Sequence, residues 1–485
     1  MHHLISRAGI IFTRALLYGA PVGLIMLLTL AVMHLQSRPE LSLWHKVKLD
    51  AEFTAEQGAT NFEDYLATEQ KVFTQLEQLV YQQLPGGDRQ RINRYSRDSL
   101  SNPDKWAHNW NRSFELLKEN PRAGILLLHG MSDSPYSLRA IGQALNNRGA
   151  QVIGLRYPGH GTAPSGLTGL RWQDMARAVE LAMAHLRDKV GEQPIYIIGY
   201  SAGGALAVNY ALQALSHAQY PRIDGLVLIS PAIGVSSLAA LAVWQGRLGY
   251  LLGLDKLKWS DIKPEYDPYK YNSFAVNAGD QVYRLTLEIS KLIDQHSATA
   301  DLEKLPPILA FQSSVDATVS TKALVDGLFS RLPPNGNKLV LFDINRRVEM
   351  EPLLLSDPTL QFSPLLEQEN LPFSLTLLTN SDLKNDSAIL LKRSASDPAI
   401  QKVSTGIKWP GNIYSLSHVA LPFSRDDPLY GPQKVANRNL IYLGDIATRG
   451  ERGVLQVSAG DMLRLRWNPF YPLMEAQIKD FLKLD

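Results

Sequence analysis

The chain of 485 residues contains no cysteine. This absence excludes disulfide bonds, a cysteine nucleophile and thiolate metal sites, although it does not indicate a cellular compartment. Histidine and acidic residues do not cluster at the spacing of metal ligands, and no glycine-rich loop suits a phosphate group. We therefore expect no metal and no other cofactor. The net charge of +2 gives no argument for a nucleic-acid partner.

Charged residues are also missing from one long apolar run, which extends from Ala15 to Leu35. The run is long enough to span a bilayer. Arg7 and Arg14 precede it, and positive charge before a span favours a cytoplasmic N-terminus. No small-residue cleavage site ends the run, which favours an uncleaved signal anchor over a cleaved signal peptide. The sequence predicts a single-pass protein of the cytoplasmic membrane with its main part on the extracytoplasmic, periplasmic side.

The residues I-Y-I-I-G-Y-S-A-G-G, positions 195–204, combine a buried strand with the pattern G-x-S-x-G, and a helix-forming run follows. Strand, G-x-S-x-G and helix in this order are typical of a nucleophile elbow, a sharp strained turn that exposes its serine. Gly199 and Gly203 flank Ser201, because side chains there would collide with the neighbouring strand and helix. An ordinary strand-to-helix turn is the alternative. We predict Ser201 as a nucleophile.

A second strand-like run, A-G-I-L-L-L, leads into His129, Gly130 and Met131. In this layout the backbone N–H after the His-Gly pair points at the oxygen that becomes negative during acyl transfer. The two predicted oxyanion donors are the N–H groups of Met131 and Ala202. His129 lies in this loop, and a structural role is favoured there over that of general base.

A serine nucleophile needs a base and an orienting acid. Asp316 follows an apolar strand that starts near Pro306, and we predict it as the acid. It could instead cap the next helix, and Asp343, after a later strand, is the alternative acid. His418 is the only histidine beyond Asp316, and the chain order Ser, Asp, His is the one that the elbow architecture uses. We predict His418 as the base.

Five segments together carry a family resemblance: L-L-L-H-G-M-S-D-S-P, R-Y-P-G-H-G-T, G-Y-S-A-G-G, S-V-D-A-T-V and S-H-V-A-L-P. They resemble the α/β hydrolases, in the branch that holds monoacylglycerol lipases, lysophospholipases and serine aminopeptidase-like esterases. The resemblance spans about 120–425. It implies an α/β fold with a mostly parallel central sheet and a cap insertion, and it implies that His160 shapes a loop. Asp316 and His418 are 102 positions apart, which is wider than in this branch and implies a second insertion.

The predicted organisation has three parts. Residues 1–36 form a cytoplasmic tip and transmembrane anchor, 37–120 a helical extension, and 121–485 the catalytic domain. The cap insertion is expected at about 231–300 and the second insertion at about 344–410, where it could add a sheet edge or a cap.

Three smaller features leave alternatives open. Apolar residues at helical spacing between 62 and 80 are typical of a helix packed on the domain, with a partner-binding helix as the alternative. The basic stretch at 88–97 is expected to be a solvated face, with contact to lipid headgroups as the alternative. Aromatic residues of the cap could line an acyl pocket or form the cap's own core; they are Tyr266, Tyr269, Tyr271 and Phe274.

We expect a membrane-anchored serine hydrolase that cleaves carboxylic esters, with an acyl ester as substrate and a lipid ester favoured by the resemblance. It would work through a Ser201–His418–Asp316 triad and an acyl-enzyme. Thioesterases, acyltransferases and peptidases use the same triad, and a non-enzymatic membrane-tethered scaffold is a further alternative. The sequence names no protein partner, and it leaves the acyl length, the head group and the oligomeric state open.

Overall fold

The structure is a computed structural model. It describes residues 36–56, 59–84, 92–234, 254–346, 357, 362–383, 385–411, 413–433, 440–444 and 465–484, together with four single positions, Val22, Met26, Thr29 and Met33.

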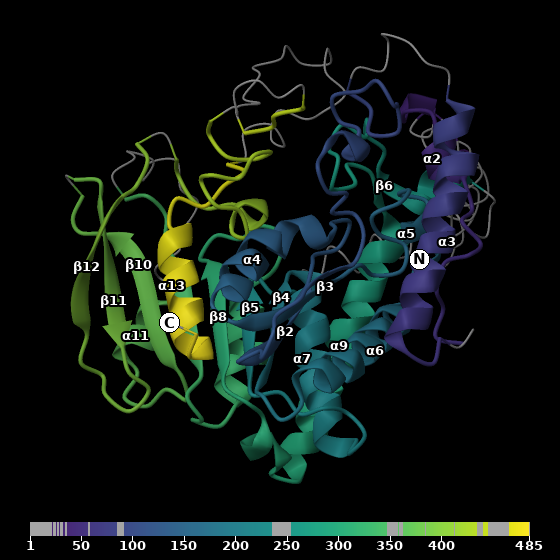
Figure 1. Ribbon diagram of the computed structural model, residues 1–485. Helices are drawn as coiled ribbons and strands as arrows, with labels where there is room; N and C mark the ends of the chain where they lie inside the picture. Colours follow the sequence, from purple (N-terminus) through teal and green to yellow (C-terminus); the bar gives the residue numbers. More distant parts are fainter. Residues whose placement is uncertain are drawn as a thin grey trace, which may run out of the picture.

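A ten-stranded sheet forms the centre of the described chain, in the order β1-β3-β2-β4-β5-β8-β9-β10-β11-β12 (Figure 1). The strands from β3 across to β10 run parallel, whereas β1, β11 and β12 at the two edges pair antiparallel. Their bounds are β1 Phe114–Leu116, β2 Ala123–Leu128, β3 Ala150–Leu155, β4 Ile195–Tyr200, β5 Gly225–Ile229, β8 Ile308–Ser313, β9 Lys338–Phe342, β10 Ser374–Asn380, β11 Ser387–Arg393 and β12 Gln401–Lys408. A separate two-stranded sheet pairs β6 Trp259–Asp261 with β7 Phe274–Ala275.

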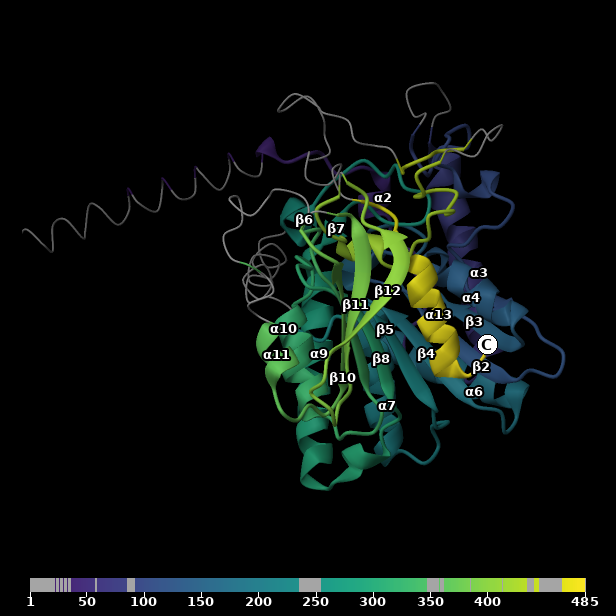
Figure 2. The same ribbon diagram turned by 90° about the vertical axis from the view of Figure 1, so that its left-hand side faces the viewer.

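Helices cover both faces of the sheet, and Figure 2 shows α9 and α10 on one side and α4 and α13 on the other. The α-helices are α2 Leu43–Lys46, α3 Phe62–Leu79, α4 Arg139–Asn147, α5 Gly166–Gly169, α6 Trp172–Val190, α7 Ala202–Ser216, α9 Val276–Ala298, α10 Thr321–Gly327, α11 Ser363–Glu367 and α13 Tyr471–Leu482. Short 3-10 turns lie at η1 Tyr81–Gln83, η3 Pro103–Lys105, η4 Pro135–Leu138, η5 Asp255–Lys258, η6 Asp301–Lys304, η7 Phe329–Arg331 and η10 His418–Ala420.

The central strands are apolar throughout because both of their faces are buried. Along β2, Leu126 and Leu128 join the core that contains α6, α7 and α9. Ile125 and Leu127 join the opposite core under α4 and α13. This alternation explains why the sequence shows continuous apolar runs in place of a polar and apolar alternation. The apolar runs near 123–128, 150–155, 194–199, 223–230, 306–312 and 338–343, which the sequence predicts as strands, all form strands.

Helix α9 lies inside the stretch that we assigned to the cap insertion. Its buried residues Val282, Leu285, Ile289 and Ile293 recur every three or four positions, so they form one face. This face contributes to the core that also contains α6 and α7. From Val276 onward the chain is therefore part of the helical layer, and the local helical spacing within 276–298 was a signal that we did not use.

The second expected insertion adds β10, β11 and β12 to the sheet edge after β9. Figure 1 shows these green strands at the side of the sheet opposite α3. The strand-like residues at 373–379 form β10, whereas β11 and β12 were not expected. The segment thus extends the sheet before the chain reaches His418.

The N-terminal extension packs on the domain. Helix α3 buries Tyr65, Val72 and Leu76, and Phe62 and Tyr65 join the core around α6. The expectation of a solvated face at 88–97 is wrong for Arg94, which is only 1% exposed. The cost of burying its guanidinium is offset in part because the Nη groups donate to the Asn111 side chain at 3.0 Å and to the carbonyls of Asp267 and Gly161 at 3.4 Å.

The predicted span, residues 15–35, lies outside the described residues except for Val22, Met26, Thr29 and Met33. Within the described part of the chain, no helix combines the length and apolar character that crossing a membrane requires.

Candidate active site

Ser201 occupies a strained turn between β4 and α7. Its backbone angles are φ 55° and ψ −118°, in a region that residues other than glycine rarely adopt. Its N–H donates to the carbonyl of Ile229 at 3.0 Å, and its own carbonyl accepts from Ala232 at 3.0 Å. The chain after β5 therefore holds the turn from both sides, at the N-terminus of α7, and the side chain stays half-buried.

The two glycines around Ser201 leave room that no larger residue would leave. A Cβ at Gly203 would lie 2.0 Å from the carbonyl oxygen of Leu128, and a Cβ at Gly199 would lie 2.5 Å from the carbonyl oxygen of Gly203. No rotamer change relieves these contacts, because the opposing atoms belong to the backbone. The close approach of α7 to β2 and β4 thus requires glycine at both positions.

The loop after β2 runs beside Ser201. A Cβ built on Gly130 would lie 3.2 Å from the Ser201 Cβ, and the turn is closed by Asp133 N–H donating to the Gly130 carbonyl at 3.2 Å. Met131 lies inside this turn. Among the described residues, neither the Met131 N–H nor the Ala202 N–H donates a hydrogen bond. Both predicted donors are therefore available to a ligand.

The structure brings Asp316 and His418 together across 102 positions of sequence. The His418 Nδ1 and the Asp316 Oδ2 lie 2.8 Å apart. The other carboxylate oxygen, Oδ1, accepts the N–H groups of Thr318 and Val319 at 2.8 and 3.0 Å. Burial alone would raise the pKa of Asp316, but the facing His418 and these two donors lower it below its ordinary value. Asp316 is thus held as a carboxylate oriented toward the imidazole.

His418 also lies against the elbow. Its ring centroid is 5.3 Å from that of Tyr200, the residue before Ser201, and the Tyr200 hydroxyl donates to the His418 carbonyl at 3.4 Å. Ser417 ties the loop to the chain before α13 through a 2.7 Å hydrogen bond to the Leu465 carbonyl. Within the described part, the Ser201 hydroxyl and the His418 Nε2 form no hydrogen bond. In structures without substrate such catalytic hydrogen bonds are often long, and they shorten when substrate binds.

Asp343, the alternative acid, binds other side chains. Its carboxylate forms a two-pronged ion pair with Arg346, with both contacts at 2.9 Å, and accepts the Thr379 hydroxyl at 2.7 Å. It therefore anchors the connection between β9 and β10, and the imidazole of His418 faces Asp316.

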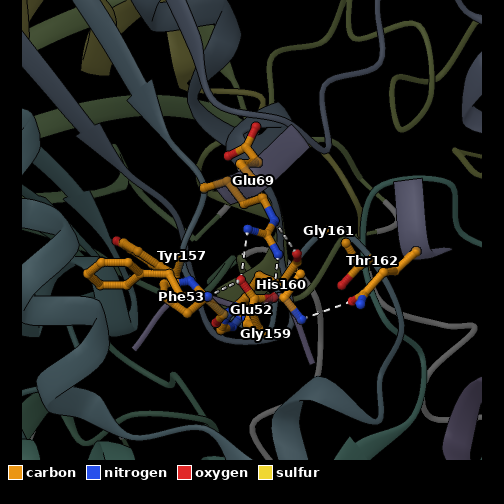
Figure 3. Close-up of polar contacts among 12 residues, drawn as sticks. Glu52, Phe53, Glu69, Tyr157, Gly159, His160, Gly161 and Thr162 are labelled. Carbon is orange, nitrogen blue, oxygen red and sulfur yellow. Dashed lines mark hydrogen bonds and ion pairs between the residues drawn. The ribbon is translucent and has the colours of Figure 1, made fainter. Parts of the chain in front are cut away.

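His129 and His160 take part in loop packing. The Nδ1 of His129 lies 2.8 Å from the Gly130 carbonyl, and its ring is 4.2 Å from that of Tyr157. Burial lowers the pKa of His129 well below its usual range and that of His160 to about 3. Both imidazoles are therefore neutral. Figure 3 shows His160 beside Gly159 in this loop. Glu52 of the N-terminal extension lies next to them, and its carboxylate accepts the Gly159 N–H at 2.9 Å.

The aromatic residues of the cap pack as a core. Tyr269 stacks on Tyr136 with ring centroids 4.2 Å apart, and Tyr271 accepts the Thr162 N–H at 2.7 Å. Tyr269 and Tyr271 are buried against protein. Tyr269 and Tyr271 therefore belong to the cap's own core and do not fit the alternative of an acyl pocket lining.

A cavity of about 500 Å³ lies between residues 41–54 of the extension, the loop at 158–170 and residues 255–259. Ser201, Asp316 and His418 are not among its lining residues. It is therefore separate from the predicted nucleophile. Among the described residues, no group of three or more His, Asp and Glu side chains could hold a metal ion.

Comparison with known proteins points to one family. Residues 119–343 match the family described as serine aminopeptidase, S33. This match, together with the order of the parallel strands, supports an α/β-hydrolase fold for the segment. The thermostable monoacylglycerol lipase of Bacillus sp. (strain H-257) is 29% identical over 202 residues, which are 41% of this chain and 73% of that protein. Phospholipase YtpA of Bacillus subtilis (strain 168) is 26% identical over 128 residues, 24% of this chain and 43% of that protein, so the match spans less than half of that relative.

Among solved structures, the monoacylglycerol lipase of Paleococcus ferrophilus is similar, with 21% identity, a TM-score of 0.37, and coverage of 48% of this chain and 88% of that chain. The family match over residues 119–343 and the likeness to the Bacillus lipase make the protein a serine hydrolase of the lipase and esterase type.

Sequence reasoning missed two groups at the site of this hydrolase. Gln312, at the end of β8, donates to the Asp316 Oδ2 at 3.0 Å and so helps to orient the carboxylate. Its position four residues before Asp316 was the available signal. Asp133, in the loop after β2, is a buried carboxylate, and nothing in the local sequence distinguishes it from a solvated loop residue.

Proposed function

We propose that the hydrolase cleaves carboxylic esters of acyl chains, with lipid monoesters as substrates, through Ser201, His418 and Asp316. The observation that carries this proposal is the 2.8 Å contact between His418 and Asp316, whose loop lies against the strained Ser201 turn. The likeness to a monoacylglycerol lipase supports the substrate class.

In the proposed mechanism the Ser201 hydroxyl oxygen attacks the acyl carbonyl. Because the Nδ1 of His418 faces Asp316, the Nε2 takes the serine proton and later delivers it to the leaving alcohol. The N–H groups of Met131 and Ala202 stabilise the oxyanion. Water then enters and its oxygen attacks the acyl carbonyl while His418 takes a proton from it. As the bond between the acyl carbon and the Ser201 oxygen breaks, His418 returns this proton to Ser201 and the acid leaves. Asp316 stays ionised and stabilises the imidazolium.

The substrate class is tested with a series of 4-nitrophenyl esters from acetyl to palmitoyl and with 1-monooleoylglycerol. We expect hydrolysis of the oxygen esters, with kcat/KM rising toward longer acyl chains. A matched thioester and an amino-acid anilide test the other uses of the triad. Faster turnover of either one would assign the enzyme to the thioesterases or the peptidases.

We further propose that residues 15–35 anchor the enzyme in the cytoplasmic membrane, with the catalytic domain on the extracytoplasmic side. The run without charged residues supports this proposal. Val22, Met26 and Met33 are helical and more than half exposed, which suits contact with lipid.

An alkaline phosphatase fusion after residue 120 tests the topology and should be active in a bacterial host. The full chain should sediment with membranes and resist carbonate extraction. A chain that starts at Ser37 retains Arg38, which donates to the carbonyls of Lys256 and Trp259, so it should fold, stay in the supernatant and hydrolyse a short ester. An inactive fusion or a membrane-bound short chain would contradict the anchor.

A further inference from the structure

The cap segment 265–273 is held in one conformation by its own buried carboxylates. Glu265 accepts the N–H groups of Asn272 and Ser273, both at 2.9 Å. Asp267 accepts those of Tyr269 and Lys270 at 2.9 and 3.1 Å. Charge-assisted hydrogen bonds of this kind fix a short turn firmly.

This turn is docked on the loop that carries the predicted oxyanion donor. Tyr271 N–H donates to the Ser132 carbonyl at 2.8 Å, one residue after Met131. The Tyr271 hydroxyl bonds to the loop at 159–162, and Tyr269 stacks on Tyr136. Both neighbours of Lys270 are therefore buried anchors, which fix the position of the backbone at Lys270.

The side chain of Lys270 is the charged group that this docking presents at the loop. Its Nζ lies 3.9 Å from the Asp133 Oδ2, beyond hydrogen-bond distance, and its side chain is 24% exposed. Asp133 lies behind it, 3% exposed, in the turn that contains Met131. Among the described residues the Lys270 ammonium donates no hydrogen bond. Within the described ranges it is therefore a half-buried cation that faces the Asp133 carboxylate beyond hydrogen-bond distance.

The electrostatics agree with a position near the reacting groups. Burial raises the pKa of Asp133 to about 6, while the positive charge of Lys270, the Ser134 N–H and, more weakly, the neighbouring His418 oppose this rise. Burial is the main cause of the lowered pKa values of His129 and His160, and Lys270 makes a minor contribution in the same direction. The ammonium thus lies within electrostatic range of the oxyanion loop and of its flanking histidines.

We propose that Lys270 binds a phosphate group on the leaving alcohol, so that the enzyme prefers lysophospholipid-type monoesters over neutral monoacylglycerols. This inference rests on the proposed ester hydrolase function. A phosphate oxygen would supply the hydrogen-bond acceptor that the ammonium does not have in the described part of the chain. A charge-assisted contact in a partly desolvated site is stronger than one between neutral groups. Asp133 is a positioning residue that holds the ammonium over the loop.

The test compares 1-oleoyl-lysophosphatidic acid with 1-monooleoylglycerol in the same neutral detergent, since the two esters differ only in the phosphate. We expect the ratio of their kcat/KM values to favour the phosphate ester in the wild type. Lys270→Gln should lower this ratio about tenfold, which corresponds to one charged hydrogen bond of about 1.4 kcal/mol, and Lys270→Arg should retain most of it.

Lys263→Gln is the matched control. Lys263 also lies in the cap, its side chain is 21% exposed, and its Nζ is 3.7 Å from Asp261, so the same loss of charge there should leave the ratio unchanged. A ratio in Lys270→Gln equal to that of the wild type, or no phosphate preference in the wild type, would overturn the assignment of Lys270 while leaving ester hydrolysis in place. Failure of the wild type to cleave either ester would instead overturn the proposed function.

Discussion

The proposed nucleophile side of the site and the proposed acid–base side are built in different ways. Ser201, its flanking glycines and the turn at 130–133 come from the ends of neighbouring strands β4 and β2, and short-range sterics determine their geometry. Asp316 and His418 are joined by a hydrogen bond across 102 positions, and β9 to β12 lie between them in sequence. The geometry of the first side depends on a local sequence motif. The geometry of the second side depends on the position to which the chain comes back after the long insertion.

The largest expected effect is removal of the nucleophile or the base. Ser201→Ala and His418→Ala should each reduce kcat on the order of 10⁶-fold, and the double variant should be no worse, because groups that act as a unit are not additive. Steady-state kinetics on one soluble ester measure this. Ser216→Ala, an exposed serine at the end of α7, is the control and should keep full activity. Additive losses would show that the two sides do not work together.

The choice of acid gives the next largest effect. Asp316→Asn should cost about 10⁴-fold in kcat, because an amide no longer selects the imidazole tautomer that accepts the serine proton. Asp343→Asn should instead lower the free energy of unfolding by about 3 kcal/mol, since Arg346 loses its buried partner. Its kcat per folded molecule should stay within a few-fold of the wild type. The reverse pattern would make Asp343 the acid.

The turn around Ser201 can be disrupted by a steric clash that changes none of the proposed reacting groups. Gly203→Ala places a Cβ 2.0 Å from the Leu128 carbonyl oxygen and should cost about 3 kcal/mol or more in unfolding free energy. At Gly169 a Cβ meets nothing within 4 Å, so Gly169→Ala should be neutral or stabilising by up to about 1 kcal/mol. Urea unfolding of both variants measures the difference. Equal stability would mean that the elbow has more room than the structure shows.

The smallest effect is a contrast in pH dependence between two buried carboxylates. The pKa of Asp316 is lowered on folding, so its contribution to stability is present above about pH 4 and is lost as the pH falls through the folded value. The stability gap between wild type and Asp316→Asn should shrink below about pH 4.

Asp133 should behave in the opposite sense, because burial raises its pKa to about 6. Its ionisation destabilises the fold as the pH rises from about 4 to 6, so Asp133→Asn should gain stability over the wild type across that window, by at most about 3 kcal/mol. Unfolding curves at several pH values check both signs, and parallel slopes for the two variants would contradict the account.

The difference between the two sides also explains what could be predicted from the sequence. The elbow, both glycines and the central strands lie in contiguous motifs, so the strand and helix patterns around them were sufficient. The pairing of Asp316 with His418 followed from chain order, and the structure has them in contact. Gln312 and Asp133 were missed because their roles depend on what faces them in space. Likewise β11 and β12 pair at an edge, where strands of mixed polarity carry a weaker signal than buried parallel ones.

The most direct test of the account is to map where a fluorophosphonate probe attaches. Peptide mass spectrometry of the labelled wild type should find a single adduct, on Ser201, and labelling should be lost in Ser201→Ala and slowed by several orders of magnitude in His418→Ala. An adduct on another serine, or undiminished labelling of His418→Ala, would contradict the claim that the distant histidine activates the serine of the elbow.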